Sequence, residues 1–199
     1  MNIEQEINFY FFPQETYLKS IGLLLQQIHI QALQNDDRLD QIPNLEKKEA
    51  MIKPMPNLSN RIFILCSSLQ QMQQYDEGLW VYSQLSFLPH STENDIKLEQ
   101  QPVVLGTDPK SIQKAGDGFK ILLLMPEALQ NLRSEFYGIA GHIQKIIVPL
   151  TVEKPTSEEN MKQSAANYLK FVANSNPQLN VNIVYKNPET NHWVKKAMN

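Results

Sequence analysis

The chain has 199 residues and a mass of 22.9 kDa, a length that suits one domain with a buried core. Charged residues make up 20% of it, and the formal net charge is −3 with an isoelectric point near 5.8. The basic excess typical of proteins that grip nucleic acid unaided is absent, so no direct strong nucleic-acid binding is expected.

The sequence predicts a cytoplasmic protein that does not enter a membrane. No stretch approaches the roughly 20 consecutive apolar residues that span a bilayer. The first residues carry acids where a signal peptide would have its basic region. Cys66 is the only cysteine, which excludes an intramolecular disulfide and fits a reducing compartment.

The N-terminal part reads as a strand followed by a helix. Residues Ile7–Phe12 are β-branched and aromatic and end at Pro13, the profile of a buried strand. From Thr16 to Gln34, apolar residues recur every three or four positions and predict one helical stripe. The members of this stripe are Leu18, Ile21, Leu25, Ile28 and Ala32.

The pattern then breaks over residues 35–60, which hold three prolines, mixed charges and no sustained period. This stretch predicts a loop insertion between the first helix and the second strand.

Regular elements resume after the insertion. Short apolar runs predict strands at Arg61–Ser67, Pro102–Gly106, Ile121–Met125, Ile143–Leu150 and Asn180–Lys186. Helical spacing predicts helices at Leu69–Val81, Pro126–Tyr137 and Ser157–Asn174, the first with Leu69, Met72 and Leu79 inward. Thr107–Gly118 has the composition of a loop, and the chain from about residue 187 reads as a short C-terminal tail. Strands that alternate with helices predict an α/β fold of Rossmann-like layering, with a mostly parallel sheet and helices on both faces.

Catalytic, cofactor and metal motifs are missing from the sequence. None of the seven glycines begins a phosphate-binding loop, and Gly116-Asp-Gly118 lacks the third glycine of a dinucleotide fingerprint. The four histidines show no spacing typical of metal ligands. Cys66, at a strand end, reads as a small buried residue rather than a nucleophile. We therefore expect no cofactor, no metal and no enzymatic activity.

The segment Asp76–His90 carries more apolar and aromatic surface than a short connection easily buries. One interpretation is a helix end and loop packed on the sheet edge. The other is an exposed platform for a partner protein, because aromatic residues are enriched at interfaces.

The order of these features resembles the chi subunit family of the bacterial DNA polymerase III holoenzyme. The shared motifs are Phe9-Tyr10, Ile62–Cys66, Asp76–Trp80, Phe87–His90 and Pro102-Val103. The same order continues through the apolar strand Ile121–Met125, Val148-Pro149 and the last helix. The resemblance therefore covers roughly residues 7–34 and 61–180. It implies a single chi-like domain over residues 1–199.

The resemblance implies a non-catalytic accessory subunit of the replication machinery. Such proteins bridge the clamp loader, through the small psi subunit, to the acidic C-terminal tail of single-stranded DNA-binding protein, which ends in Pro-Phe. The family's tail pocket falls on Phe87, Val148 and Lys170. Trp80, Leu88, Pro89 and His90 are expected to form another partner surface, with packing as the alternative role of Trp80.

This sequence departs from the family pattern on the last helix. The expected arginine is Ala166, and the expected aromatic residue is Leu169, with Tyr168 beside it. Lys162 lies on the same helical stripe as Lys170 and is the candidate for the missing charge. The alternative is that both lysines are ordinary solvated residues.

Two other functions stay open from the residues alone. A small α/β enzyme or nucleotide-binding protein would need an atypical site at the carboxyl ends of the strands. Direct binding of single-stranded DNA would need aromatic stacking despite the acidic isoelectric point.

Overall fold

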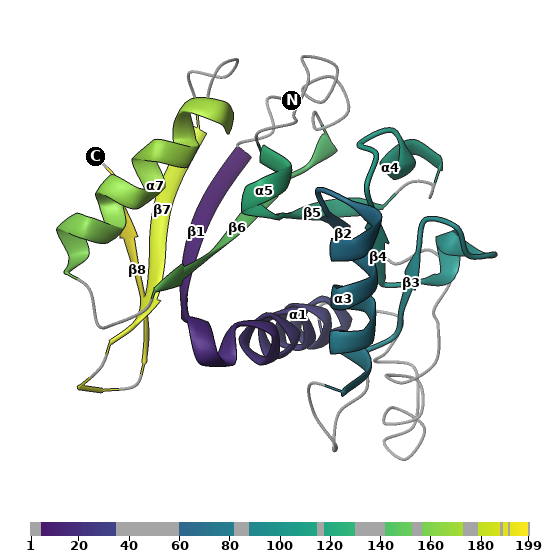
Figure 1. The fold of residues 1–199 in the computed structure, drawn as a ribbon, viewed down its shortest axis with the longest axis horizontal. Coiled ribbons are helices and arrows are strands. Elements are labelled where there is room, and N and C mark those ends of the chain that lie inside the picture. The colour runs from purple at the N-terminus through teal and green to yellow at the C-terminus, as the bar shows by residue number, and fades with distance from the viewer. Residues whose placement is uncertain are drawn as a thin grey trace.

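A computed structural model describes residues 5–34, 60–81, 88–114, 118–129, 142–152, 157–172, 179–187, 189–190 and 192–198. Eight strands form one sheet in the order β3-β4-β2-β5-β6-β1-β7-β8 (Figure 1). The strands are β1 Gln5–Pro13, β2 Arg61–Leu65, β3 His90–Thr92, β4 Val103–Gly106, β5 Phe119–Leu124, β6 Lys145–Val152, β7 Leu179–Lys186 and β8 Trp193–Ala197. Neighbouring strands are parallel except β7 and β8, which are antiparallel.

The helices flank this sheet on both faces, which confirms the predicted α/β class. They are α1 Tyr17–Gln34, α3 Leu69–Val81, α4 Ser111–Lys114, α5 Pro126–Leu129 and α7 Glu158–Val172, with 3-10 turns at Gln14–Thr16 and Leu98–Gln100. Among the described residues, none of the helices is long and apolar enough to cross a membrane.

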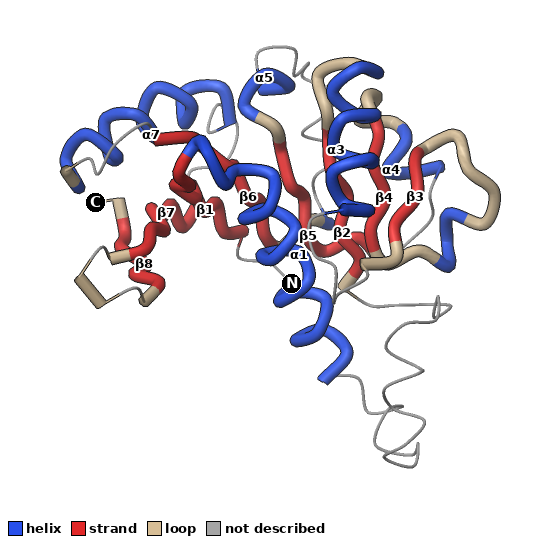
Figure 2. Tube along the Cα trace, turned by 60° about the horizontal axis from the view of Figure 1, so that its bottom comes forward, coloured by secondary structure: helices blue, strands red, loops and turns tan. Residues whose placement is uncertain are grey.

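Side-chain contacts place α1 and α7 on opposite faces of the sheet. The ring of Phe12 contacts Tyr17 at the start of α1, whereas Tyr185 donates a hydrogen bond to Glu158 at the start of α7. Phe11 pairs with Tyr185, and adjacent residues of a strand point to opposite faces. Phe12 and Tyr185 therefore lie on different faces, and so do the two helices (Figure 2).

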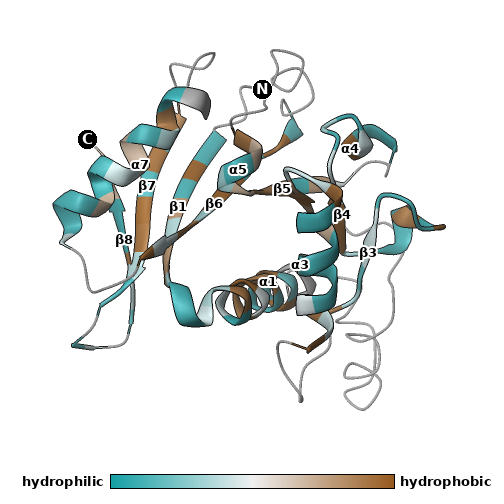
Figure 3. Cartoon of the chain, in the orientation of Figure 1, coloured by the Kyte–Doolittle hydropathy of each residue, from teal (hydrophilic) through white to brown (hydrophobic). Residues whose placement is uncertain are grey.

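The core is densest in the central strands. Every residue of β2 and β4 is buried, and apart from Arg61 at the start of β2 both strands are apolar on both faces (Figure 3). Along β1, hydrophilic and hydrophobic residues alternate, with Phe9 and Phe11 buried on the face that α7 covers. Both faces of the sheet are therefore buried at β2 and β4, whereas one face is more polar near β1.

A buried arginine ties β2 to the segment before β4. Arg61 is enclosed, its Nε donates to the carbonyl oxygen of Gln101 over 2.9 Å, and Nη2 donates to that of Leu98. The guanidinium also lies 4.0 Å from the centroid of the Phe119 ring. Burial lowers the pKa of Arg61 to about 10, against the opposing charge of Glu99, so it stays protonated near neutral pH.

Several sequence-based boundaries agree with the structure, and α3 spans the predicted residues. Two members of predicted stripes are instead exposed, Leu18 of α1 and Leu69 of α3, while Tyr75 is buried. Leu69 is the first residue of its helix, where a side chain has little of the core beneath it. The predicted insertion at 35–60, apart from Asn60, lies outside the described residues. So do residues 130–137 of the predicted helix Pro126–Tyr137.

Three segments differ from the prediction. The expected loop Thr107–Gly118 contains α4, a single helical turn. The polar strand β3 was not predicted, and the expected tail after residue 187 contains β8. Both strands lie at the edges of the sheet. An edge strand forms because it pairs with its one neighbour, and its sequence need not contain an apolar run.

Candidate partner-binding surfaces

The two halves of the Asp76–His90 motif meet in space through His90. Its Nδ1 lies 2.7 Å from the carbonyl oxygen of Leu88, and its Nε2 lies 3.3 Å from Oδ1 of Asp76. The imidazole ring is also 5.0 Å from the ring of Trp80, centroid to centroid. The acidic residue, the tryptophan and the histidine thus form one unit that joins α3 to β3.

Within this unit the exposed group is Trp80, whose surface is 56% accessible. Leu88, Pro89 and His90, expected on a partner surface, are instead buried, because they pack between α3 and β3 and support the unit from inside. Phe87, expected in the tail pocket, lies outside the described residues. Among the described residues of Asp76–His90, Trp80 and Val81 are therefore the exposed large apolar side chains, and Trp80 is the one in contact with His90.

The helix α7 carries the other predicted binding residues. Met161 and Ala165 are buried toward the sheet, and Tyr168 and Leu169 are half-buried next to them. Lys170 is exposed in the last turn. The result is an amphipathic helix with a half-buried apolar margin beside an exposed cation.

Charges at the start of α7 are already paired. Lys162 Nζ lies 3.1 Å from Glu158 Oε1, and Lys196 of β8 reaches Oε2 of the same carboxylate. Hydrogen bonds from Lys196 and Lys162 lower the pKa of Glu158. Lys162 is thus oriented by Glu158 along the helix surface, on the side where Ala166 is exposed.

Val148, the remaining predicted pocket residue, has no exposed surface. It pairs with Phe9 in the sheet and so lies on the face that α7 covers. Its side chain belongs to the core beneath the helix, and any contact with a ligand there requires the neighbouring side chains to part.

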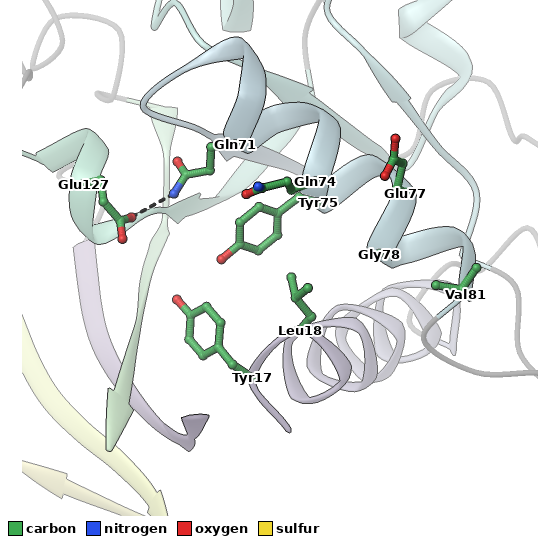
Figure 4. A pocket seen from close by; sticks show the side chains of 9 residues that line it. All are labelled: Tyr17, Leu18, Gln71, Gln74, Tyr75, Glu77, Gly78, Val81 and Glu127. Carbon is green, nitrogen blue, oxygen red and sulfur yellow. Dashed lines mark hydrogen bonds between the residues drawn. The ribbon is translucent and has the colours of Figure 1, made fainter. Parts of the chain in front are cut away.

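A groove of about 750 Å³ runs between α1 and α3 (Figure 4). Apolar Leu18 and Val81 face it together with the phenols of Tyr17 and Tyr75, and Glu77 and Glu127 lie at its margins. Gln71 closes one end by donating from Nε2 to Glu127 over 2.9 Å.

The chemistry of the groove is that of a binding surface. Tyr17 donates its hydroxyl hydrogen to the carbonyl oxygen of Pro149 over 3.0 Å, and burial raises the pKa of Tyr17 and of Tyr75.

Burial also raises the pKa of the Cys66 thiol, at the end of β2, to about 12. These groups stay protonated at neutral pH. The described part of the chain holds no cluster of three or more His, Cys, Asp or Glu residues arranged for a metal.

A further surface, which sequence reasoning missed, lies on the face of β1, β7 and β8 opposite α7. We name it the β8 patch and define it as Glu6, Tyr10, Lys186, Trp193 and Lys195. The indole of Trp193 contacts Tyr10 edge-on, and Lys195 pairs with Glu6. The signal in the sequence was the short polar turn after Lys186 and the Trp193-x-Lys195 alternation, which together are typical of a hairpin.

Comparison with known proteins places this geometry in context. A family model described as DNA polymerase III chi subunit, HolC, matches residues 6–169. None of the curated proteins matches the chain. The crystal structure of the Pyrococcus furiosus Hef helicase domain is similar over 94% of this chain, with 11% sequence identity and a TM-score of 0.41, and the match covers 36% of that chain.

Proposed function

The chain belongs to the bacterial DNA polymerase III chi subunit family, and we propose that it bridges the clamp loader to single-stranded DNA-binding protein. In this proposal one surface binds the psi subunit and another captures the C-terminal tail of single-stranded DNA-binding protein. The protein acts in the cytoplasm as a non-catalytic adaptor and needs no cofactor.

The surface that suits the tail is α7. A tail that ends in an acidic stretch and a phenylalanine needs cations for its carboxylates and an apolar site for its ring. Lys162 and Lys170 lie eight residues apart on one side of the helix, and Tyr168 and Leu169 supply the half-buried apolar margin. Val148, another predicted member, lies beneath the helix. Phe87 precedes Leu88 and β3, and six strand spacings separate β3 from β7, so we do not include it in the α7 surface.

The surface that suits psi is the exposed indole of Trp80. Its orientation is held by contact with buried His90, and a tryptophan held in place is a frequent anchor of protein interfaces.

The observation that carries the bridging role is the separation of these surfaces. Trp80 lies on α3, which packs near β3 and β4, whereas α7 packs against β7 near the other end of the sheet (Figure 1). Five strand spacings separate β4 from β7, or about 24 Å at roughly 4.8 Å each. Two partners therefore have room to bind at once, without sharing a contact residue.

Titration with a tail peptide tests the tail surface. The peptide is expected to bind, and removal of its terminal Phe is expected to abolish most of the binding. Lys170→Ala is expected to weaken binding by roughly 1–3 kcal/mol, with a further loss at higher salt. Lys114→Ala, on α4, is the matched control. Equal binding of the peptide without Phe would overturn the tail assignment.

The two-surface arrangement has its own test. Trp80→Ala is expected to lower affinity for psi and leave tail binding unchanged, whereas Lys170→Ala is expected to do the reverse. A variant that weakened both partners equally, while keeping the native melting temperature, would show that the surfaces are not separate.

A further inference from the structure

We propose that the β8 patch, together with the pocket beside it, binds single-stranded nucleic acid directly. This activity goes beyond the adaptor role and does not depend on it. The site would contact nucleic acid without sequence preference, through base stacking on Trp193 and phosphate contacts to lysines.

The first element of the site is an aromatic side chain held in a fixed orientation. Trp193 is 41% exposed, yet its indole packs against two rings of β1. The ring centroids lie 5.7 Å from Tyr10 and 5.8 Å from Phe12, at interplanar angles of 67° and 85°. Edge-on contacts of this kind fix the indole and leave part of it accessible for a base to stack.

The second element is positive charge around that ring. Nζ of Lys186 lies 6.0 Å from the centroid of the Trp193 ring. Lys195 and Lys145 approach Glu6, the one carboxylate of the patch. Two cations share this single anion, so positive charge remains to meet a phosphate.

The third element is a pocket of about 480 Å³ that continues from the patch. It opens where several strands of the sheet begin and shares Glu6 with the β8 patch. Lys145, which approaches Glu6, also lines it. Its other lining residues are Asn60, Lys120, Ile121, Gln144 and Asn180. The patch and pocket together hold four lysines against one glutamate, in a chain with 21 acidic and 18 basic residues.

These elements form a continuous track. Trp193 is opposite Lys186 at one end of β7, and Glu6 is opposite Asn180 at the other. Six residues of β7 separate those ends, or about 20 Å at roughly 3.3 Å per residue. In Figure 2, α7 lies on the other side of β7 and β8, and α1 lies farther along the sheet, next to β1 and β6.

An aromatic ring at one end of a cationic track favours nucleic acid over an acidic peptide. Every base presents a flat face that stacks on an indole, while the backbone supplies regular negative charge to the lysines. A peptide made of acidic residues alone, such as polyglutamate, uses the lysines but has no aromatic ring to stack on Trp193.

Tryptophan fluorescence supplies a local test. The chain has two tryptophans, so Trp80→Phe leaves Trp193 as the single indole reporter. A dT oligonucleotide of about 15 residues, titrated at low salt without any partner protein, is expected to quench this emission saturably. Absence of quenching, with the variant folded by circular dichroism, would overturn the proposal.

Lysine variants in the Trp80→Phe background test the phosphate contacts. Lys186→Gln is expected to weaken binding roughly threefold to tenfold and to reduce the salt slope by about 0.7. Lys114→Gln, on α4, is the matched control and is expected to leave both quantities unchanged. Equal quenching by a polyglutamate peptide, or an equal effect of the two lysine variants, would overturn the assignment to nucleic acid.

Discussion

The two faces of β1 and β7 are both substantially buried, but they achieve burial by different chemistry. Under α7, Phe9 and Ile183 are enclosed by apolar neighbours. On the opposite face, Asn182 donates hydrogen bonds to Glu6 over 3.0 Å and to Asn8 over 3.3 Å. The face under α7 is stabilised by apolar packing, whereas the opposite face combines buried apolar side chains, Phe12 and Val184, with satisfied polar groups and exposed cations at its rim.

Because of this difference, substitutions on the two faces are expected to change the free energy of unfolding by different amounts. Removing a buried apolar side chain under α7 leaves a cavity, which destabilises the fold. Removing an exposed lysine from the opposite face costs little, because water replaces the lost contacts. Beyond the part that α1 covers, the face without α7 can therefore carry exposed binding residues at small cost in stability.

The largest expected effect is on the face that α7 covers. Phe9→Ala is expected to lower the free energy of unfolding by about 3–5 kcal/mol, because it opens a cavity in a fully buried site. Lys195→Ala on the opposite face is expected to cost less than about 1 kcal/mol, because its ion pair with Glu6 is half-exposed. Urea unfolding of both variants measures the two losses in the free energy of unfolding. Equal losses would contradict the proposed difference between the two faces.

A smaller effect is expected from the buried amide on the polar face. Asn182→Ala removes the donor that Asn8 and Glu6 share, and should cost about 1–3 kcal/mol in urea unfolding. Asn167→Ala, at an exposed position of α7, is the matched control. If both substitutions cost the same, the polar network does not stabilise this face.

The smallest expected effect is a pH dependence confined to the same face. Burial would raise the pKa of Glu6, but hydrogen bonds from Lys195 and Asn8, with the charges of Lys195 and Lys145, lower it overall below 4.5. The carboxylate therefore contributes stability above its unfolded pKa, and this contribution is lost as the pH falls through the lowered folded value.

The corresponding measurement compares the wild type with Glu6→Gln at several pH values. The wild type is expected to lose more stability between about pH 5 and pH 3 than the variant does. Parallel losses in both proteins would mean that Glu6 does not titrate differently in the folded state.

Much of the architecture was predictable from sequence because its signals are local. The apolar run of β2 and the 3.6-residue spacing of α3 and α7 each specify an element without reference to distant residues. The motifs Asp76–Trp80 and Phe87–His90 likewise indicate the family from the sequence alone. For the candidate sites, sequence identified α7 and Trp80 but missed the β8 patch.

What the sequence alone determined is therefore the α/β class, the central strands and the family. Only the tertiary structure decided that His90 joins Asp76 to Trp80, that Val148 is buried beneath α7, and that the end of the chain is a strand. The physical reason is the same in each case. An edge strand such as β8 is specified by pairing with β7 and by ion pairs to residues far away in sequence, Glu6 and Glu158, and no local pattern contains those contacts.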